Sequence, residues 1–161
     1  MITGVHHISL ATSNLEAFLH FYCDLLGATP RGMFELKPGE NPPLETIVGM
    51  KNIEGRAGGL TMANMNIEVF CYSNPKPKAG ERRPACDVGI RHIAFDVKDI
   101  FGEYERLKAA GVDFISPPQK LEAGCASCYL YDPDGNIVEL QEIFPGSVVP
   151  PPPGLDATAS Q

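Results

Sequence analysis

Two histidines and two glutamates recur at matching places in the two halves of this sequence, and their chemistry is that of a metal site. His7 and His92 each lie in a short apolar segment that begins with glycine, whereas Glu68 and Glu139 each lie between aliphatic residues further along. A carboxylate buried without a partner is strongly disfavoured, and a divalent cation removes that cost. Imidazole and carboxylate suit Zn, Ni, Co, Mn or Fe(II), and four protein ligands in octahedral geometry leave two positions for water or substrate.

An internal repeat explains why these residues match. The segments Gly4–Leu15 and Gly89–Ile100 align at an offset of 85 residues, with glycine, histidine and isoleucine in the same places. Residues in a strand point alternately to opposite faces, so the histidines and glutamates should all point away from their apolar neighbours. By the same alternation His6, which Arg91 replaces in the second copy, is expected to point away from His7. A lone histidine in a strand is usually structural, and it is the repetition that favours ligands.

One helix is predicted in each half, directly after the histidine segment. In the first half, a capping pattern at 13–16 and a 3.6-residue apolar period predict a helix that ends at Gly27. In the second half, Asp99 and Gly111 bracket a helix at the matching place. The apolar side of the first helix is expected to consist of Leu15, Phe18, Leu19, Tyr22, Leu25 and Leu26.

Several strands follow each helix. Runs of β-branched and apolar residues at 65–70 and 136–140 predict strands, the second in a hairpin with 129–131 across an Asp-Gly turn. Each half therefore reads as a βαβββ unit, and the fold class is α+β. The first half has the longer insertion, because Glu68 follows His7 by 61 positions whereas Glu139 follows His92 by 47.

The pattern divides the chain into one two-module domain and a tail. We expect a domain over 1–144, with module one over about 1–75, a linker over about 76–88 rich in proline and basic residues, and module two over about 89–144. The proline-rich tail, 145–161, has no apolar period and is expected to be extended or disordered.

Composition limits the partners and the compartment. The formal net charge of −7 repels phosphate backbones and anionic lipids, so nucleic acid and membrane are excluded as partners. The sequence shows neither a membrane-spanning stretch nor an N-terminal secretion signal, so we expect a cytoplasmic protein. The irregularly spaced cysteines are expected to be reduced thiols: Cys23, Cys71, Cys86, Cys125 and Cys128.

Four motifs, at 5–8, 66–70, 89–95 and 131–140, occur in order along the repeat. With them the sequence resembles the vicinal oxygen chelate superfamily, which includes glyoxalase I, methylmalonyl-CoA epimerase, extradiol dioxygenases and the fosfomycin and bleomycin resistance proteins. This resemblance implies two modules that form a cupped mixed sheet around one divalent metal ion, with His7, Glu68, His92 and Glu139 in the ligand positions. It also implies a small-molecule substrate with two neighbouring oxygens, an enolate or enediolate intermediate, and a homodimer.

The ligand count favours lyase, isomerase or epimerase chemistry, with Glu68 or Glu139 moving the proton. Which glutamate acts as the base stays open. An Fe(II) extradiol-type dioxygenase is an alternative, although a glutamate at position 68 fills a coordination site that such enzymes keep open. A ligand-sequestering protein of the resistance type is another alternative, against which the four intact ligands count. Arginines that could contact the substrate are Arg31, Arg56, Arg82 and Arg83.

Overall fold

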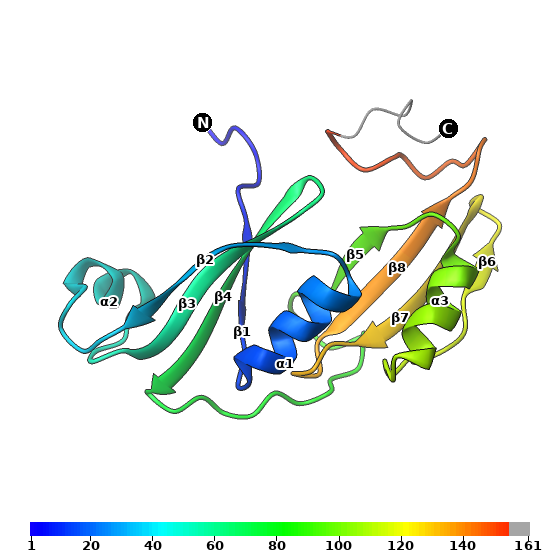
Figure 1. The fold of residues 1–161 in the computed structure, drawn as a ribbon. Helices are drawn as coiled ribbons and strands as arrows, with labels where there is room; N and C mark the ends of the chain where they lie inside the picture. Colours follow the sequence, from blue (N-terminus) through cyan, green and yellow to red (C-terminus); the bar gives the residue numbers. More distant parts are fainter. Residues whose placement is uncertain (155–161) are drawn as a thin grey trace. The chain divides into compact units, whose positions relative to one another are not determined.

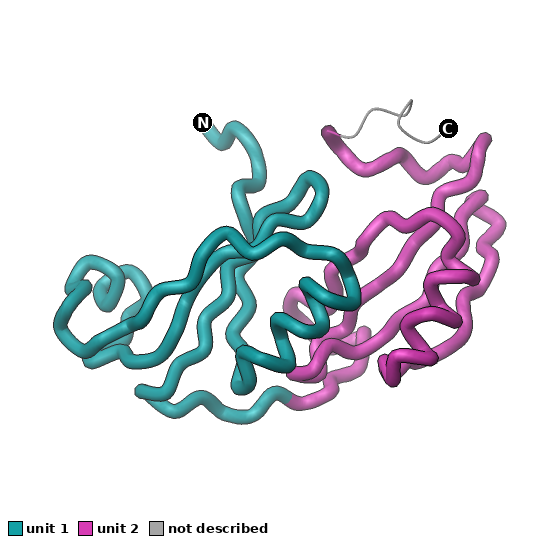
Figure 2. The backbone as a smooth tube through the Cα atoms, viewed as in Figure 1, with its two compact units in different colours: residues 1–80 teal, residues 81–161 magenta. Residues whose placement is uncertain are grey.

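The computed structural model describes residues 1–154, which fold as two compact units. Unit 1 comprises residues 1–80, and unit 2 begins at residue 81 (Figure 2). Each unit contains its own four-stranded sheet. The expected α+β fold with two tandem modules is confirmed. No helix among the described residues has the length and apolar composition that a membrane crossing requires.

Unit 1 has a mixed sheet in the order β1-β4-β3-β2, with β1 parallel to β4 and the other pairs antiparallel. An additional helix, α2, connects β2 to β3 along the chain and lies at one end of these strands (Figure 1). The elements are β1 (Ile8–Ala11), α1 (Leu15–Leu19), a π-helical segment η1 (His20–Leu25), β2 (Thr29–Leu36), α2 (Pro42–Val48), β3 (Glu54–Met62) and β4 (Met65–Asn74).

Unit 2 repeats this topology without the additional helix. Its sheet has the order β5-β8-β7-β6, again with the first pair parallel. The helix α3 lies across one face of that sheet (Figure 1). The elements are β5 (His92–Asp96), α3 (Ile100–Ala109), β6 (Gln119–Leu121), β7 (Cys125–Tyr131) and β8 (Ile137–Ile143).

The first helix begins as predicted but does not continue as an α-helix. The Asn14 side chain accepts a hydrogen bond from the Ala17 backbone amide and so caps α1. From His20 the chain is π-helical, and the wider turn changes which residues share a face. Phe21, which lies outside the predicted apolar side, is therefore buried together with Tyr22.

The second helix matches its prediction. The Asp99 side chain caps it by accepting a hydrogen bond from the Gly102 amide. The Glu142 carboxylate accepts two more, from the backbone amides of Asp99 and Ile100, and thereby ties the helix to β8. These bonds satisfy amides that have no partner inside a helix. The buried residues of α3 are the predicted ones: Ile100, Tyr104 and Leu107.

The long insertion of the first half forms α2 and a small apolar core. Leu36, Ile53, Ala57 and Phe70 are buried together, and residues of α2 pack against them. The aromatic rings of Phe70 and Tyr72 stack in parallel, with centroids 5.3 Å apart. The insertion therefore covers one end of the β3–β4 surface, a short distance along β4 from Glu68.

The tail begins with ordered contacts. After β8, the Val148 amide and the Ser147 hydroxyl both donate hydrogen bonds to the Ala123 carbonyl. These bonds hold the start of the tail beside the β6–β7 turn. The rest of the expected extended or disordered tail, 155–161, lies outside the described residues.

Candidate metal centre

Each unit brings one histidine and one glutamate together at its parallel strand pair: His7 directly precedes β1, and His92 is the first residue of β5. The register of β1 against β4 places Glu68 opposite the residue two positions after His7. The register of β5 against β8 places Glu139 opposite the residue two positions after His92. The repeat seen in the sequence is therefore repeated in strand register, and each pair arises from the same local geometry.

The two pairs are close and accessible. The Nε2 atom of His7 lies 3.6 Å from Oε2 of Glu68, and both side chains are 41% exposed. The Nε2 atom of His92 lies 3.1 Å from Oε2 of Glu139, and these side chains are 37% and 14% exposed. In both units the Nε2 atom of the imidazole and a carboxylate oxygen face one another, as donor atoms for a shared cation would.

The expectation that His6 points away from His7 is wrong. The Nδ1 atoms of the two residues are 2.8 Å apart, within hydrogen-bond distance, and their rings meet edge to face. Strand alternation does not apply here because β1 begins only at Ile8. His6 therefore contacts Nδ1 of His7, whereas Nε2 of His7 is the ring nitrogen that faces Glu68.

In unit 2, the glutamate has additional partners from the neighbouring strand β7. The Ser127 hydroxyl donates a hydrogen bond to the Glu139 carboxylate. The Tyr129 ring lies beside the His92 ring, with centroids 5.3 Å apart. Burial raises the pKa of Tyr129, and the negative charge of Glu139 raises it further. The Tyr129 hydroxyl therefore stays protonated at neutral pH beside the pair.

In unit 1, the space beside the pair is open. A cavity of about 610 Å³ adjoins His7 and Glu68. Gly59, the residue of β3 that pairs with Glu68, has no side chain, whereas Tyr129 occupies the corresponding place opposite Glu139. The two units are therefore not equivalent around their glutamates. The apolar lining of the cavity comes from Met33, Phe34, Leu60 and Ile67, and its other polar lining from His6, Arg31 and Asn66.

The structure thus forms two His–Glu pairs, each within one unit. No group of three or more His, Cys, Asp or Glu side chains suited to a metal ion occurs in the part of the chain that the structure describes. All five cysteines are free thiols, as expected. Burial, followed by the charge of Glu139, raises the pKa of Cys128 to about 11, so this thiol is protonated and inert at neutral pH.

Sequence reasoning missed Ser127, Tyr129 and Asn66 as neighbours of the pairs. Ser127 and Tyr129 alternate along β7, and the register of the predicted hairpin would have placed Tyr129 opposite Glu139. Asn66 lies two residues before Glu68 and so shares its face of β4. Alternation within known strands could therefore have identified all three residues.

Comparison with known families gives a match over most of the chain. Residues 4–140 match the Glyoxalase/Bleomycin resistance protein/Dioxygenase superfamily. Among solved structures, a glyoxalase family protein from Bacillus cereus is similar with a TM-score of 0.79 at 19% identity, over 89% of this chain and 96% of that one. A fosfomycin resistance protein from Listeria monocytogenes is similar with a TM-score of 0.61 at 22% identity, over 88% and 94%. These two likenesses show the fold.

Individual relatives differ in what they are named for. An uncharacterized protein of Escherichia coli, YaeR, is 29% identical over 86% of this chain and 95% of its own length. An ethylmalonyl-CoA/methylmalonyl-CoA epimerase of Cereibacter sphaeroides is 30% identical over 89% of this chain and its full length. A biphenyl-2,3-diol 1,2-dioxygenase of Rhodococcus globerulus is 31% identical, but the chain spans only 60% of that protein.

Proposed function

Because the chain belongs to the Glyoxalase/Bleomycin resistance protein/Dioxygenase superfamily, we propose that it is a divalent-metal-dependent lyase, isomerase or epimerase that moves a proton next to a carbonyl group. The observation that carries the proposal is the pair of equivalent His–Glu contacts, at 3.6 Å and 3.1 Å. The epimerase relative, which aligns over its full length, supports this branch of the superfamily.

The side chains present fit a metal ion. Two imidazoles and two carboxylates form a donor set suited to Zn, Ni, Co, Mn or Fe. Half of the set lies in each unit, and all four side chains retain solvent access that a cation could use. We propose that His7, Glu68, His92 and Glu139 hold one divalent ion together, with the two pairs supplied by one chain or by two copies in a homodimer. When bound, the cation supplies Lewis-acid chemistry, which acidifies the proton next to a coordinated carbonyl.

The surroundings of the two glutamates indicate different roles. Glu139 is mostly buried and is held by Ser127 and His92, so it is suited to be a fixed ligand. Glu68 is more exposed and faces the open cavity, and no hydrogen bond to its carboxylate is found among residues 1–154. A carboxylate with this freedom can turn toward a substrate and accept its proton. We propose Glu68 as the principal base and Glu139 as the more firmly held partner.

Hydrogen exchange at the substrate carbon tests this reaction class. Metal-loaded protein in deuterated water should introduce deuterium next to the carbonyl of a methylmalonyl thioester or of a 2-oxoaldehyde hemithioacetal, as followed by proton NMR. Glu68→Gln should slow this exchange by about 10²–10⁴-fold, the usual contribution of a general base. His92→Ala should lose both the metal and the exchange.

Two results would point to other branches. Consumption of oxygen with a catechol, dependent on Fe(II) and tolerant of Glu68→Gln, would identify a ring-cleaving dioxygenase instead. Tight binding of a small ligand by metal-free protein, with no exchange under any metal, would identify a sequestering protein. Exchange that is equally fast without metal would contradict the proposal directly.

A further inference from the structure

We propose that Arg31 binds a carboxylate at the far end of the substrate whose reacting end lies at the His7–Glu68 pair. The inference rests on the proposed function, because that function places the reacting end of the substrate at the His7–Glu68 pair. Arg31 lines the same 610 Å³ cavity as the pair and is itself exposed to it. The arginine therefore adds a fixed positive charge to the wall of the candidate site.

The strand holds Arg31 in an unusual way. Pro30 pairs with Leu60 and Gly32 pairs with Gly59, so Arg31 is the extra residue of a β-bulge in β2. Bulges redirect a side chain and are frequent beside active sites. The backbone at Gly32 has φ of +129°, a conformation that glycine adopts without strain. The glycine thus permits the bulge that directs Arg31.

A second contact orients the guanidinium. Nη1 of Arg31 donates a hydrogen bond of 3.1 Å to Oδ1 of Asn66, and Nδ2 of Asn66 donates one of 3.2 Å to the His6 carbonyl. Asn66 lies on the same face of β4 as Glu68. This contact orients the guanidinium in the cavity that the pair also lines, and the guanidinium keeps further N–H donors for a bidentate contact with a carboxylate.

The other arginines considered from the sequence already have acidic partners. Arg31, in contrast, has no carboxylate within ion-pair distance among residues 1–154, so its charge is available to a ligand. The three occupied pairs are Arg56 with Glu35 at 3.4 Å, Arg82 with Asp113 at 2.6 Å, and Arg83 with Asp87 at 3.1 Å.

The rest of the cavity defines the class of substrate. Its remaining lining is largely apolar, including Met33, Phe34 and Leu60. A ligand that fits has two neighbouring oxygens at one end, a short apolar chain, and a carboxylate at the other end. Two probes differ in that last group alone: 2-oxoglutarate carries the distal carboxylate, and 2-oxopentanoate of equal length ends in a methyl group.

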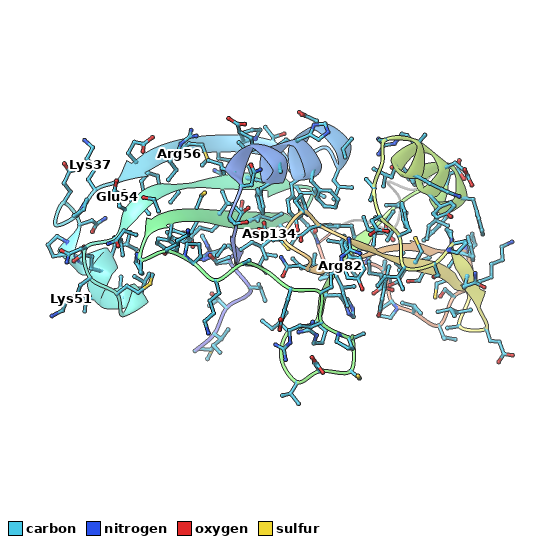
Figure 3. All side chains as sticks on the ribbon, turned by 90° about the horizontal axis from the view of Figure 1, so that it is seen from below. Lys37, Lys51, Glu54, Arg56, Arg82 and Asp134 are labelled. Carbon is cyan, nitrogen blue, oxygen red and sulfur yellow. The ribbon has the colours of Figure 1, made fainter. Side chains whose placement is uncertain are left out.

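Binding of the two probes tests the proposal. Their dissociation constants are measured by calorimetry on Mn²⁺-loaded wild type, Arg31→Gln and Arg56→Gln. Arg56 is the matched control, since it lies on the next strand, is paired with Glu35, and lies near Lys37 and Glu54 (Figure 3). Wild type and Arg56→Gln should bind 2-oxoglutarate roughly tenfold or more tightly than 2-oxopentanoate, as expected for a hydrogen bond between charged groups. Arg31→Gln should bind both probes equally, with its Mn²⁺ affinity unchanged.

An absent preference in wild type, or a preference that survives Arg31→Gln, would overturn the proposal. Failure to bind Mn²⁺ would instead overturn the proposed function, and Arg31 is then tested on metal-free protein. There, 2-oxoglutarate but not 2-oxopentanoate should shift the Arg31 side-chain Nε–H resonance in NMR spectra, and this signal should be missing in Arg31→Gln. No shift with either probe would refute the role of Arg31 on its own.

Discussion

Ser127 on β7 donates its hydroxyl hydrogen bond to the carboxylate of Glu139 on β8, and so fixes one of the four candidate metal ligands. Ala57 is the matching position of unit 1, because it pairs with Phe70, two residues after Glu68, as Ser127 pairs with Gln141, two residues after Glu139. Alanine has no hydroxyl to donate. Each glutamate contacts the histidine of its own unit, but only Glu139 also accepts a hydrogen bond from the neighbouring strand, so it is held more firmly than Glu68.

Ser127→Ala should weaken metal binding without unfolding the protein. Contacts that orient a metal ligand typically contribute 10–100-fold to affinity, and we expect a loss of that size for Mn²⁺ or Zn²⁺. Competition with a fluorescent chelator measures it, with Ser73→Ala, an exposed serine at the far end of β4, as the control. Equal affinities in the two variants would show that the Ser127 contact does not support a ligand.

His6→Ala should reduce metal affinity through His7, by about 10–100-fold on the same grounds. The ring of His6 contacts Nδ1 of His7, so its loss should leave the His7 ring free to rotate. His20→Ala is the control, because His20 lies on the surface beside Asp24. Equal metal affinities of His6→Ala and His20→Ala would contradict a role of His6 in orienting His7.

Asp132→Ala should destabilise unit 2. The buried Asp132 carboxylate accepts hydrogen bonds from the backbone amides of Asp134 and Asn136 and from the Asn136 side chain, and so builds the β7–β8 turn. Leaving these donors without an acceptor should cost about 2–4 kcal/mol in urea unfolding. Asp24→Ala, which removes an exposed pair with His20, should change the free energy of unfolding by less than about 0.5 kcal/mol.

Cys128 should alkylate much more slowly than the exposed Cys86. Because burial raises its pKa to about 11, only about one thousandth of it is thiolate at pH 8, and its rate with iodoacetamide should still be rising as the pH passes 9. Cys86 is exposed and should react first. Mass spectrometry of a labelling time course measures both sites. Early labelling of Cys128 at pH 8 in folded protein would contradict the buried, protonated thiol.

The repeat made most of the fold predictable. Because the two halves share Gly, His and Ile at matched positions, the residue pattern alone located β1, β4, β5, β7, β8, α3, the start of α1 and the residues of the His–Glu pairs. It did not locate β2, β3 or β6, and it did not predict the helix α2. The contact of His7 with Glu68, and of His92 with Glu139, then follows from strand register.

Features that depend on more than the local spacing of apolar residues could not be predicted from the sequence. The apolar period of residues 15–26 predicts a continuous α-helix and does not mark the π-helical segment His20–Leu25, in which Phe21 is buried. The bulge at Arg31 inserts one residue into β2, and no residue that precedes Gly32 predicts this insertion. The side-by-side placement of His6 and His7 required knowing where β1 starts.

The stoichiometry of metal binding tests the central claim most directly. Equilibrium dialysis of the full chain against Mn²⁺ or Zn²⁺, with elemental analysis, should give one ion per chain, whether the pairs combine within a chain or between two copies. His7→Ala and His92→Ala should each lower the affinity by more than the roughly 100-fold that an outer contact can cost. Two ions per chain, or a site that survives the loss of either histidine, would contradict a single centre shared by both pairs.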